Sequence, residues 1–214
     1  MAKSRVIKTD SVTVDRPRRF SMIRDFHFAD LFTLANGFCG IAAIFQAMNF
    51  VGSNDRTHLY VAVGIIPLAI VFDFLDGRIA RWRHKASPMG RELDSLADVI
   101  SFGAAPAAIG YSVGLQTALD QIILIYFAAC AISRLARYNI TAEDLADTPQ
   151  GKVKYFEGTP VPLNILPLGI TLFAFTYGNL FPVTIAGVEF HLVSLLYLLF
   201  GSTMISKTLH IPKP

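Results

Sequence analysis

This chain consists of long apolar blocks separated by shorter polar segments. It lacks the short period of apolar and polar residues that an amphipathic helix or strand of a soluble protein shows. Six segments are apolar enough to be membrane helices. They run over approximately residues 31–50, 59–76, 93–114, 121–139, 160–181 and 189–206. Several are close to the shortest helix that spans a bilayer, which needs about 20 residues. The pattern therefore predicts an all-α integral membrane protein, a bundle of six transmembrane helices.

The residues before the first apolar segment are polar and basic. Residues 1–17 have the composition of a flexible polar arm, whereas residues 18–214 are expected to form one membrane domain. That domain starts with RRFSMIRDFHFAD, which mixes basic and aromatic residues at helical spacing. This stretch fits either an amphipathic helix in the membrane interface or a juxtamembrane linker. The arm has no apolar run like that of a cleavable signal peptide, so the first membrane helix should direct insertion.

Composition and charge agree with a membrane location and predict an orientation. Of the 214 residues, 53% are hydrophobic and only 16% are charged, whereas soluble domains have about 25% charged residues. If six helices place both chain ends on one side, all of the nineteen Lys and Arg residues except Arg56 fall on that side. Basic residues stay on the cytoplasmic side of membranes. We therefore expect this side to face the cytoplasm, and we expect no nucleic-acid partner.

Four aspartates interrupt the apolar blocks near the predicted cytoplasmic side. Asp73 and Asp76 are three residues apart, and Asp94 and Asp98 are four apart, so each pair lies on one helix face. A charged carboxylate at the centre of a bilayer costs roughly 2.5–3.5 kcal/mol. Two divalent cations would balance four negative charges, and Mg²⁺ or Mn²⁺ take oxygen ligands of this kind. Because paired metals are common where phosphorus is attacked, the aspartates predict a two-metal phosphoryl-transfer site.

Small and basic residues follow the first aspartate pair. Gly77 and Ala80 leave the backbone after Asp76 open to a bulky ligand. Arg81 then adds a guanidinium, which pairs well with phosphate. With Gly90 and the second aspartate pair, these residues form the pattern Asp-Gly-x2-Ala-Arg-x8-Gly-x3-Asp-x3-Asp. This pattern resembles the signature of the CDP-alcohol phosphotransferase family, and each fixed position is filled. The extra aspartate upstream of the pattern also matches the family.

Within this family, further stretches resemble the membrane phosphatidylserine synthases: DLFTLANGFCGIAAI, ELDSLADVISFGAAPA, and SRLARYNIT followed by KYFEGTPVP. The combination of RRFSMIRDFHFADLFTLANGF, RWRHKASPMGRELDSLAD and KYFEGTPVP is most similar to the enzymes of fungal type, and the likeness extends over roughly residues 18–214. The resemblance implies transfer of a phosphatidyl group from CDP-diacylglycerol to the hydroxyl of L-serine, with release of CMP. It also implies a homodimer, in the endoplasmic reticulum membrane if the source is fungal or in the plasma membrane if it is prokaryotic.

The resemblance also implies a role for individual residues. The ligands of the two divalent cations would be Asp73, Asp76, Asp94 and Asp98. Asp98 would in addition take the proton from the serine hydroxyl. The residues that would line the CDP-diacylglycerol pocket are Gly77, Ala80 and Arg81, with Thr33 and Asn36 as further candidates.

Arg134 and Arg137 are candidates for serine binding. They are three residues apart on one face of the fourth predicted helix. Because guanidinium groups pair well with planar oxyanions, they could bind the serine carboxylate or the donor's diphosphate, or they could anchor the helix at the interface. Other acceptors, such as inositol or glycerol phosphate, stay open. Carboxylates inside a membrane can also indicate a cation transporter, but the chain shows no convincing internal repeat of the kind that transporters have.

Overall fold

The computed structural model of this chain describes residues 28–83, 88–146, 155–185, 187–206 and 210–212. Within these ranges, the side chains of residues 28–29, 80–83, 88, 142–146, 155–157 and 210–212 are not described. The predicted arm at residues 1–17, and most of the basic and aromatic segment after it, lie outside the described residues.

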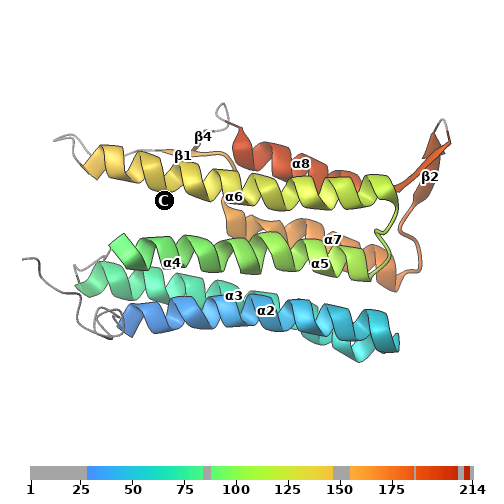
Figure 1. Cartoon of the computed structure of the whole chain (residues 1–214), viewed down its shortest axis with the longest axis horizontal. Helices are drawn as coiled ribbons and strands as arrows, with labels where there is room; N and C mark the ends of the chain where they lie inside the picture. The colour runs from blue at the N-terminus through green and yellow to red at the C-terminus, as the bar shows by residue number, and fades with distance from the viewer. Residues whose placement is uncertain (1–27, 84–87, 147–154, 186, 207–209, 213–214) are drawn as a thin grey trace, which may run out of the picture.

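Helices make up most of the described chain and lie side by side in a bundle (Figure 1). The long ones are α2 (Phe28–Ser53), α3 (Arg56–Arg83), α4 (Pro88–Asp98) continued by η1 (Val99–Ala104) and α5 (Ala105–Ser112), and α6 (Ala118–Ala146). These provide four candidate membrane spans, since each is long and apolar enough to cross a bilayer. The described structure is thus mostly helical, as the hydrophobic pattern predicts.

The C-terminal part of the bundle differs from the prediction of two further full-length helices. η2 (Val161–Asn164) leads into α7 (Ile165–Thr176), and α8 (Ser194–Ile205) follows. α7 and α8 have 12 residues each. At 1.5 Å per residue this gives helices of about 18 Å, against about 30 Å for the hydrocarbon layer of a bilayer. Neither is therefore long enough by itself to be a full span.

Beside the predicted helices, the structure contains two small sheets that the sequence analysis did not predict. β1 (Tyr155–Glu157) pairs with β4 (His210–Pro212), and β2 (Pro182–Ile185) pairs with β3 (Val188–His191), both antiparallel. The last predicted helix began at residue 189, which lies in β3. The sequence VEFH alternates apolar and polar residues, a pattern that favours a strand. Gly187, in the turn before β3, takes a positive φ of 82°, which glycine adopts readily.

The turn between α2 and α3 follows from three polar residues. Ser53 ends α2, and Asn54 takes a positive φ of 55°. Asp55 then caps α3, because its Oδ1 accepts a hydrogen bond from the Thr57 amide at 2.9 Å. Hydrogen bonds from Thr57 lower the pKa of the Asp55 carboxyl. The cap therefore fixes where α3 begins and lets α3 run back along α2.

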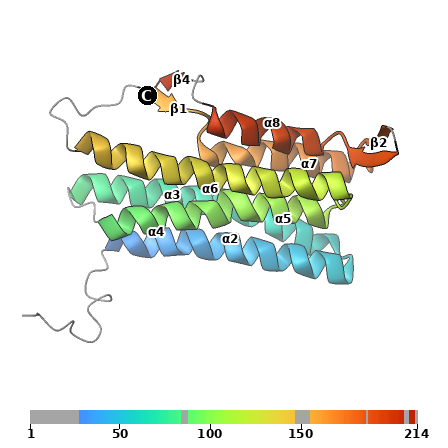
Figure 2. The same cartoon turned by 45° about the horizontal axis from the view of Figure 1, so that its top comes forward.

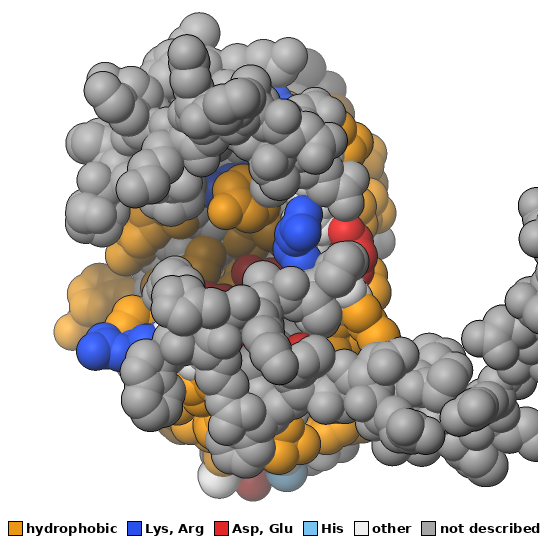
Figure 3. Space-filling view, turned by 90° about the vertical axis from the view of Figure 1, so that its left-hand side faces the viewer, with side chains coloured by type: hydrophobic (Ala, Val, Ile, Leu, Met, Phe, Trp, Pro, Cys, Tyr) orange, Lys and Arg blue, Asp and Glu red, His pale blue; other side chains and the backbone are white. Residues whose placement is uncertain are grey.

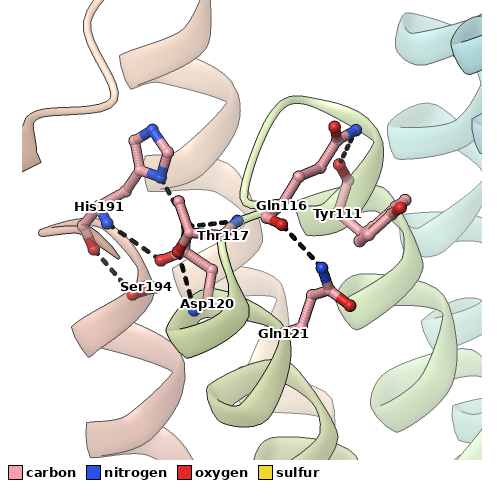
Figure 4. A network of polar contacts seen from close by, with 7 residues as sticks. All are labelled: Tyr111, Gln116, Thr117, Asp120, Gln121, His191 and Ser194. Carbon is pink, nitrogen blue, oxygen red and sulfur yellow. Dashed lines mark hydrogen bonds and ion pairs between the residues drawn. The ribbon is translucent and has the colours of Figure 1, made fainter. Parts of the chain in front are cut away.

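The two ends of the bundle are made of different elements (Figures 1 and 2). One end holds the start of α2, the end of α3, the start of α4 and the end of α6. The opposite end holds the β2–β3 hairpin and a hydrogen-bonded network (Figure 4). In that network the buried Asp120 accepts bonds from the His191 amide at 3.0 Å and from Thr117 Oγ1 at 2.8 Å, and it lies 2.6 Å from His191 Nδ1. Asp120 thereby ties β3 to the start of α6.

Candidate active site

The four aspartates come from α3 and α4. Asp73 and Asp76 lie in the C-terminal half of α3, which ends at Arg83, and Asp94 and Asp98 lie in the C-terminal half of α4, which ends at Asp98. One carboxylate oxygen each from Asp73, Asp76 and Asp94 lie within 4.8 Å of one another. Asp98 is one turn beyond Asp94, and both Asp76 and Asp98 are buried, at 5% and 7% exposed. The two helix faces that the spacing predicts therefore point toward one another.

The carboxylate cluster has the properties of a site for divalent cations. Asp94 Oδ1 is buried and has no hydrogen-bond partner among the described residues. Within the same part of the chain, no Lys or Arg side chain forms an ion pair with any of the four carboxylates. Like charges this close repel one another unless a cation or protons neutralise them. An all-oxygen set of donors suits Mg²⁺ or Mn²⁺.

Helix α2 holds two of the aspartates in place. Thr33 Oγ1 donates to Asp76 Oδ2 at 2.8 Å, and Asn36 Nδ2 donates to Asp98 Oδ1 at 2.9 Å. Both donors are buried and lie one turn apart on α2. Hydrogen bonds of this kind orient metal-ligating side chains. The sequence analysis predicted that these two residues lie beside the donor substrate, and it did not predict that they orient the aspartates. The one signal for this role in the sequence is that both lie on the same face of a helix.

The two arginines of α6 have different surroundings. Arg134 is only 9% exposed, lies close enough to Asp98 to attract it electrostatically, and has no partner for Nε among the described residues. Arg137 is more exposed and donates from Nη2 to the Ile205 carbonyl at 3.2 Å, at the end of α8. Arg134 is therefore the one that can bind an anion beside the aspartates. Arg137 fixes the end of α8 against α6.

The other predicted donor-binding residues lie on the last turns of α3. Gly77 follows Asp76 and is partly buried. The helical backbone includes Ala80 and Arg81, but the side chains of these two lie outside the described part of the chain.

A polar bridge between α4 and α6 was not predicted. Ser95 Oγ donates to Asn139 Oδ1 at 3.1 Å, and Asn139 Nδ2 donates to Glu92 Oε1 at 3.2 Å. Ser95 is one residue after Asp94, so the bridge lies beside the carboxylate cluster. No spacing rule marks these residues in the sequence.

The surface at this end of the bundle is hollowed (Figure 3). Hydrophobic side chains line the hollow, acidic side chains lie deep inside it, and basic side chains lie near its rim. Such a site can receive a ligand that has both an apolar part and a phosphate-bearing part.

Comparison with known proteins gives a family match and several relatives. The sequence model described as CDP-alcohol phosphatidyltransferase matches residues 26–202, which include all four aspartates. A CDP-diacylglycerol–serine O-phosphatidyltransferase of Saccharomyces cerevisiae is 44% identical over 204 residues, covering 91% of this chain and 74% of that protein. Proteins of the same name from Bacillus subtilis and Methanocaldococcus jannaschii are 31% and 35% identical. These alignments cover 77% and 70% of this chain, and 85% and 62% of the two relatives.

Proposed function

Because this chain belongs to the CDP-alcohol phosphatidyltransferase family, we propose that it transfers the phosphatidyl group of CDP-diacylglycerol to the hydroxyl of L-serine. The products are phosphatidylserine and CMP. The names of relatives from a fungus, a bacterium and an archaeon support this choice of substrates. The single observation that carries the proposal is the cluster of carboxylates, partly or fully buried, inside a hollow with apolar walls at one end of the membrane helices.

The aspartates would bind the two divalent cations that the reaction needs. Asp73, Asp76 and Asp94 form the closest group of oxygen ligands, and Asp98 adds a fourth carboxylate one turn further on. When bound, Mg²⁺ or Mn²⁺ would stabilise the negative charge on the phosphoryl oxygens of the donor. Thr33 orients one of these carboxylates through its 2.8 Å hydrogen bond. Gly77, Ala80 and Arg81 would contact the CDP group.

Asp98 is our candidate for the general base. Asn36 binds its Oδ1, which leaves Oδ2 to accept the proton of the serine hydroxyl. The serine oxygen then forms its bond to the phosphorus of the phosphatidyl group, the bond from that phosphorus to CMP breaks, and CMP leaves with the electron pair. A base placed in this way typically contributes about 10²–10⁴ in rate.

Arg134 is our candidate for the serine carboxylate. It is buried and near Asp98, and its Nε lacks a partner among the described residues. Since only a few bonds separate the carboxylate of serine from its hydroxyl, a serine bound at Arg134 would present that hydroxyl to Asp98. Arg137 would have to give up its bond to the Ile205 carbonyl to take part. The alternative ligand of both arginines is the diphosphate of the donor.

Six crossings, with the site facing the cytoplasm, are part of the same proposal. α7 and α8 are apolar, and the β2–β3 hairpin extends their shared end of the bundle (Figure 2). The exception in the charge pattern, Arg56, lies at the end of the bundle opposite the aspartates. A homodimer is also proposed, in the endoplasmic reticulum membrane of a fungal cell or the plasma membrane of a prokaryotic one. Light scattering of the purified protein in detergent would measure the number of subunits.

One assay tests the proposed activity. Purified protein in mixed micelles is given CDP-diacylglycerol, radiolabelled L-serine and Mg²⁺ or Mn²⁺, and both the labelled lipid and the released CMP are measured. We expect the two products in equal amounts, and neither product without metal. Unlabelled inositol and glycerol 3-phosphate are added in separate reactions and should not reduce the serine product. Release of CMP with one of these alcohols and not with serine would replace the proposed acceptor.

A further inference from the structure

A proline alters the hydrogen bonding of the helical segment that follows Asp98. Pro106 has no amide proton, so it cannot donate the usual helical hydrogen bond to the carbonyl of Phe102, four residues earlier. Its ring also crowds that carbonyl. The helix widens here, since Val99–Ala104 form the π-helix η1, which ends with a hydrogen bond between residues five apart. π-Helical turns occur frequently at functional sites.

The carbonyl of Phe102 receives a donor from another part of the chain. Asn164, the last residue of η2, is fully buried, and its Nδ2 donates to Phe102 O at 2.8 Å. The same nitrogen lies 3.3 Å from Met204 Sδ on α8, which is a weaker acceptor. A buried carbonyl that has lost its donor is strongly unfavourable. Asn164 therefore stabilises the π-helical form of η1.

η1 also contacts the residue that holds the Asp98 carboxylate. Ser101 Oγ, on η1, donates to the backbone carbonyl of Asn36 at 2.8 Å, and the side chain of Asn36 donates to Asp98. The contact is close because Gly40 has no side chain. A Cβ at this position would lie 2.6 Å from Ser101 Oγ. The position of η1 is thus coupled to that of Asn36 and, through it, to that of Asp98.

We propose that Asn164 is a positioning residue for Asp98. By donating to the carbonyl of Phe102, it fixes η1 in one form. In this form Ser101, on η1, and Asp98, directly before η1, both contact Asn36 on α2. This inference rests on the proposed function, in which Asp98 is both base and metal ligand. Asn164 lies outside the sequence motif, more than sixty positions after Asp98. The proposal adds it to the residues that determine the reaction rate.

The test compares three variants with the unmodified protein. Asn164→Leu removes the donor and keeps a similar volume. The double variant Asn164→Leu/Pro106→Ala restores an amide that can donate to Phe102 O from within the helix. Met204→Leu, the matched control, removes only the sulfur acceptor. For each we measure kcat and the serine KM. We also measure, without substrates, the Mn²⁺ concentration that gives half of the metal-induced rise in the thermal unfolding temperature.

The proposal requires a specific pattern. Asn164→Leu should lower kcat about tenfold and raise the half-saturating Mn²⁺ concentration about tenfold, the range seen when support for metal ligands is lost. Its serine KM should change little. Adding Pro106→Ala should recover most of both effects, and Met204→Leu should match the unmodified protein. Normal kcat and metal response in Asn164→Leu, or no recovery in a folded double variant, would overturn the proposal.

Two further outcomes are also decisive. If Asn164→Leu does not fold, Asn164→Ala, which removes the same donor without adding apolar bulk, is judged by the same criteria. Failure of both to fold, with no recovery from Pro106→Ala, would show that Asn164 acts on the whole fold and would overturn the proposal. An unmodified protein that binds Mn²⁺ but does not use serine would contradict the proposed function instead, because the metal titration needs no substrate.

Discussion

Replacing Arg134 should weaken serine binding specifically. The side chain is 9% exposed, so a bond from its guanidinium to a carboxylate would form out of contact with bulk water. A hydrogen bond to a charged group is worth about 1.5–3 kcal/mol. With tenfold in binding for every 1.4 kcal/mol, Arg134→Gln should raise the serine KM about 10- to 150-fold. Arg134→Lys should also be impaired, because an ammonium lacks the planar fork of the guanidinium.

Arg137 provides the matched control on the same helix. Its guanidinium donates to the Ile205 carbonyl, so Arg137→Gln should change the serine KM by no more than about threefold, while stability falls by about 0.5–1.5 kcal/mol. The assay is steady-state kinetics with one substrate varied at a time, since loss of uniform binding raises KM and leaves kcat nearly unchanged.

Three kinetic results would contradict this role of Arg134. A higher KM for CDP-diacylglycerol with an unchanged serine KM would assign Arg134 to the diphosphate. An equal effect of both variants on the serine KM would show that the two arginines act together, as their spacing in the sequence suggests. Normal kinetics in both would leave them as interfacial anchors.

Three further results are expected. Asp98→Asn keeps an oxygen that can accept the bond from Asn36, but the side chain can no longer act as a base. Turnover should fall at least about a hundredfold, while equilibrium binding of labelled CDP-diacylglycerol should persist. Near-normal turnover would show that Asp98 is not the general base. Excess chelator should abolish activity, and Mg²⁺ or Mn²⁺ should restore it; full turnover in chelator would exclude the two-metal mechanism. Asp120→Asn, at the opposite end of the bundle, should lower stability in thermal unfolding by about 1–3 kcal/mol, because a buried acceptor of several hydrogen bonds loses its charge. The rise in unfolding temperature that Mn²⁺ causes should not change in this variant. A smaller rise would show that the two ends of the bundle are coupled.

The hydrophobic pattern predicted the helices best where their apolar runs are long. The four long spans have the predicted order and nearly the predicted positions, because about 20 apolar residues in a row leave few alternatives in a membrane. The lengths of the last two helices were overestimated. A hydropathy window does not distinguish a short helix followed by an apolar hairpin from one continuous helix, and residues such as Val188 and Phe190 suit both.

The aspartate motif predicted which side chains gather, and comparison with known proteins confirms the family that it indicated. Helical spacing places Asp73 beside Asp76 without any knowledge of the tertiary structure. Contacts between helices are not encoded in such local spacing. The bond from Thr33 to Asp76 depends on how α2 packs against α3, and the bond from Arg137 to the Ile205 carbonyl depends on where α8 ends.

The lengths of the helices on opposite flanks of the bundle differ greatly. α3 has 28 residues and extends over about 42 Å, whereas the 12 residues of α8 extend over about 18 Å. α2 and α3 lie on one flank and α7 and α8 on the other (Figures 1 and 2). Lipids next to the short helices must compress or tilt to cover them, at a cost of fractions of a kcal/mol per Å of hydrophobic mismatch. Annular lipid on the α7–α8 flank should therefore be thinner than on the α2–α3 flank.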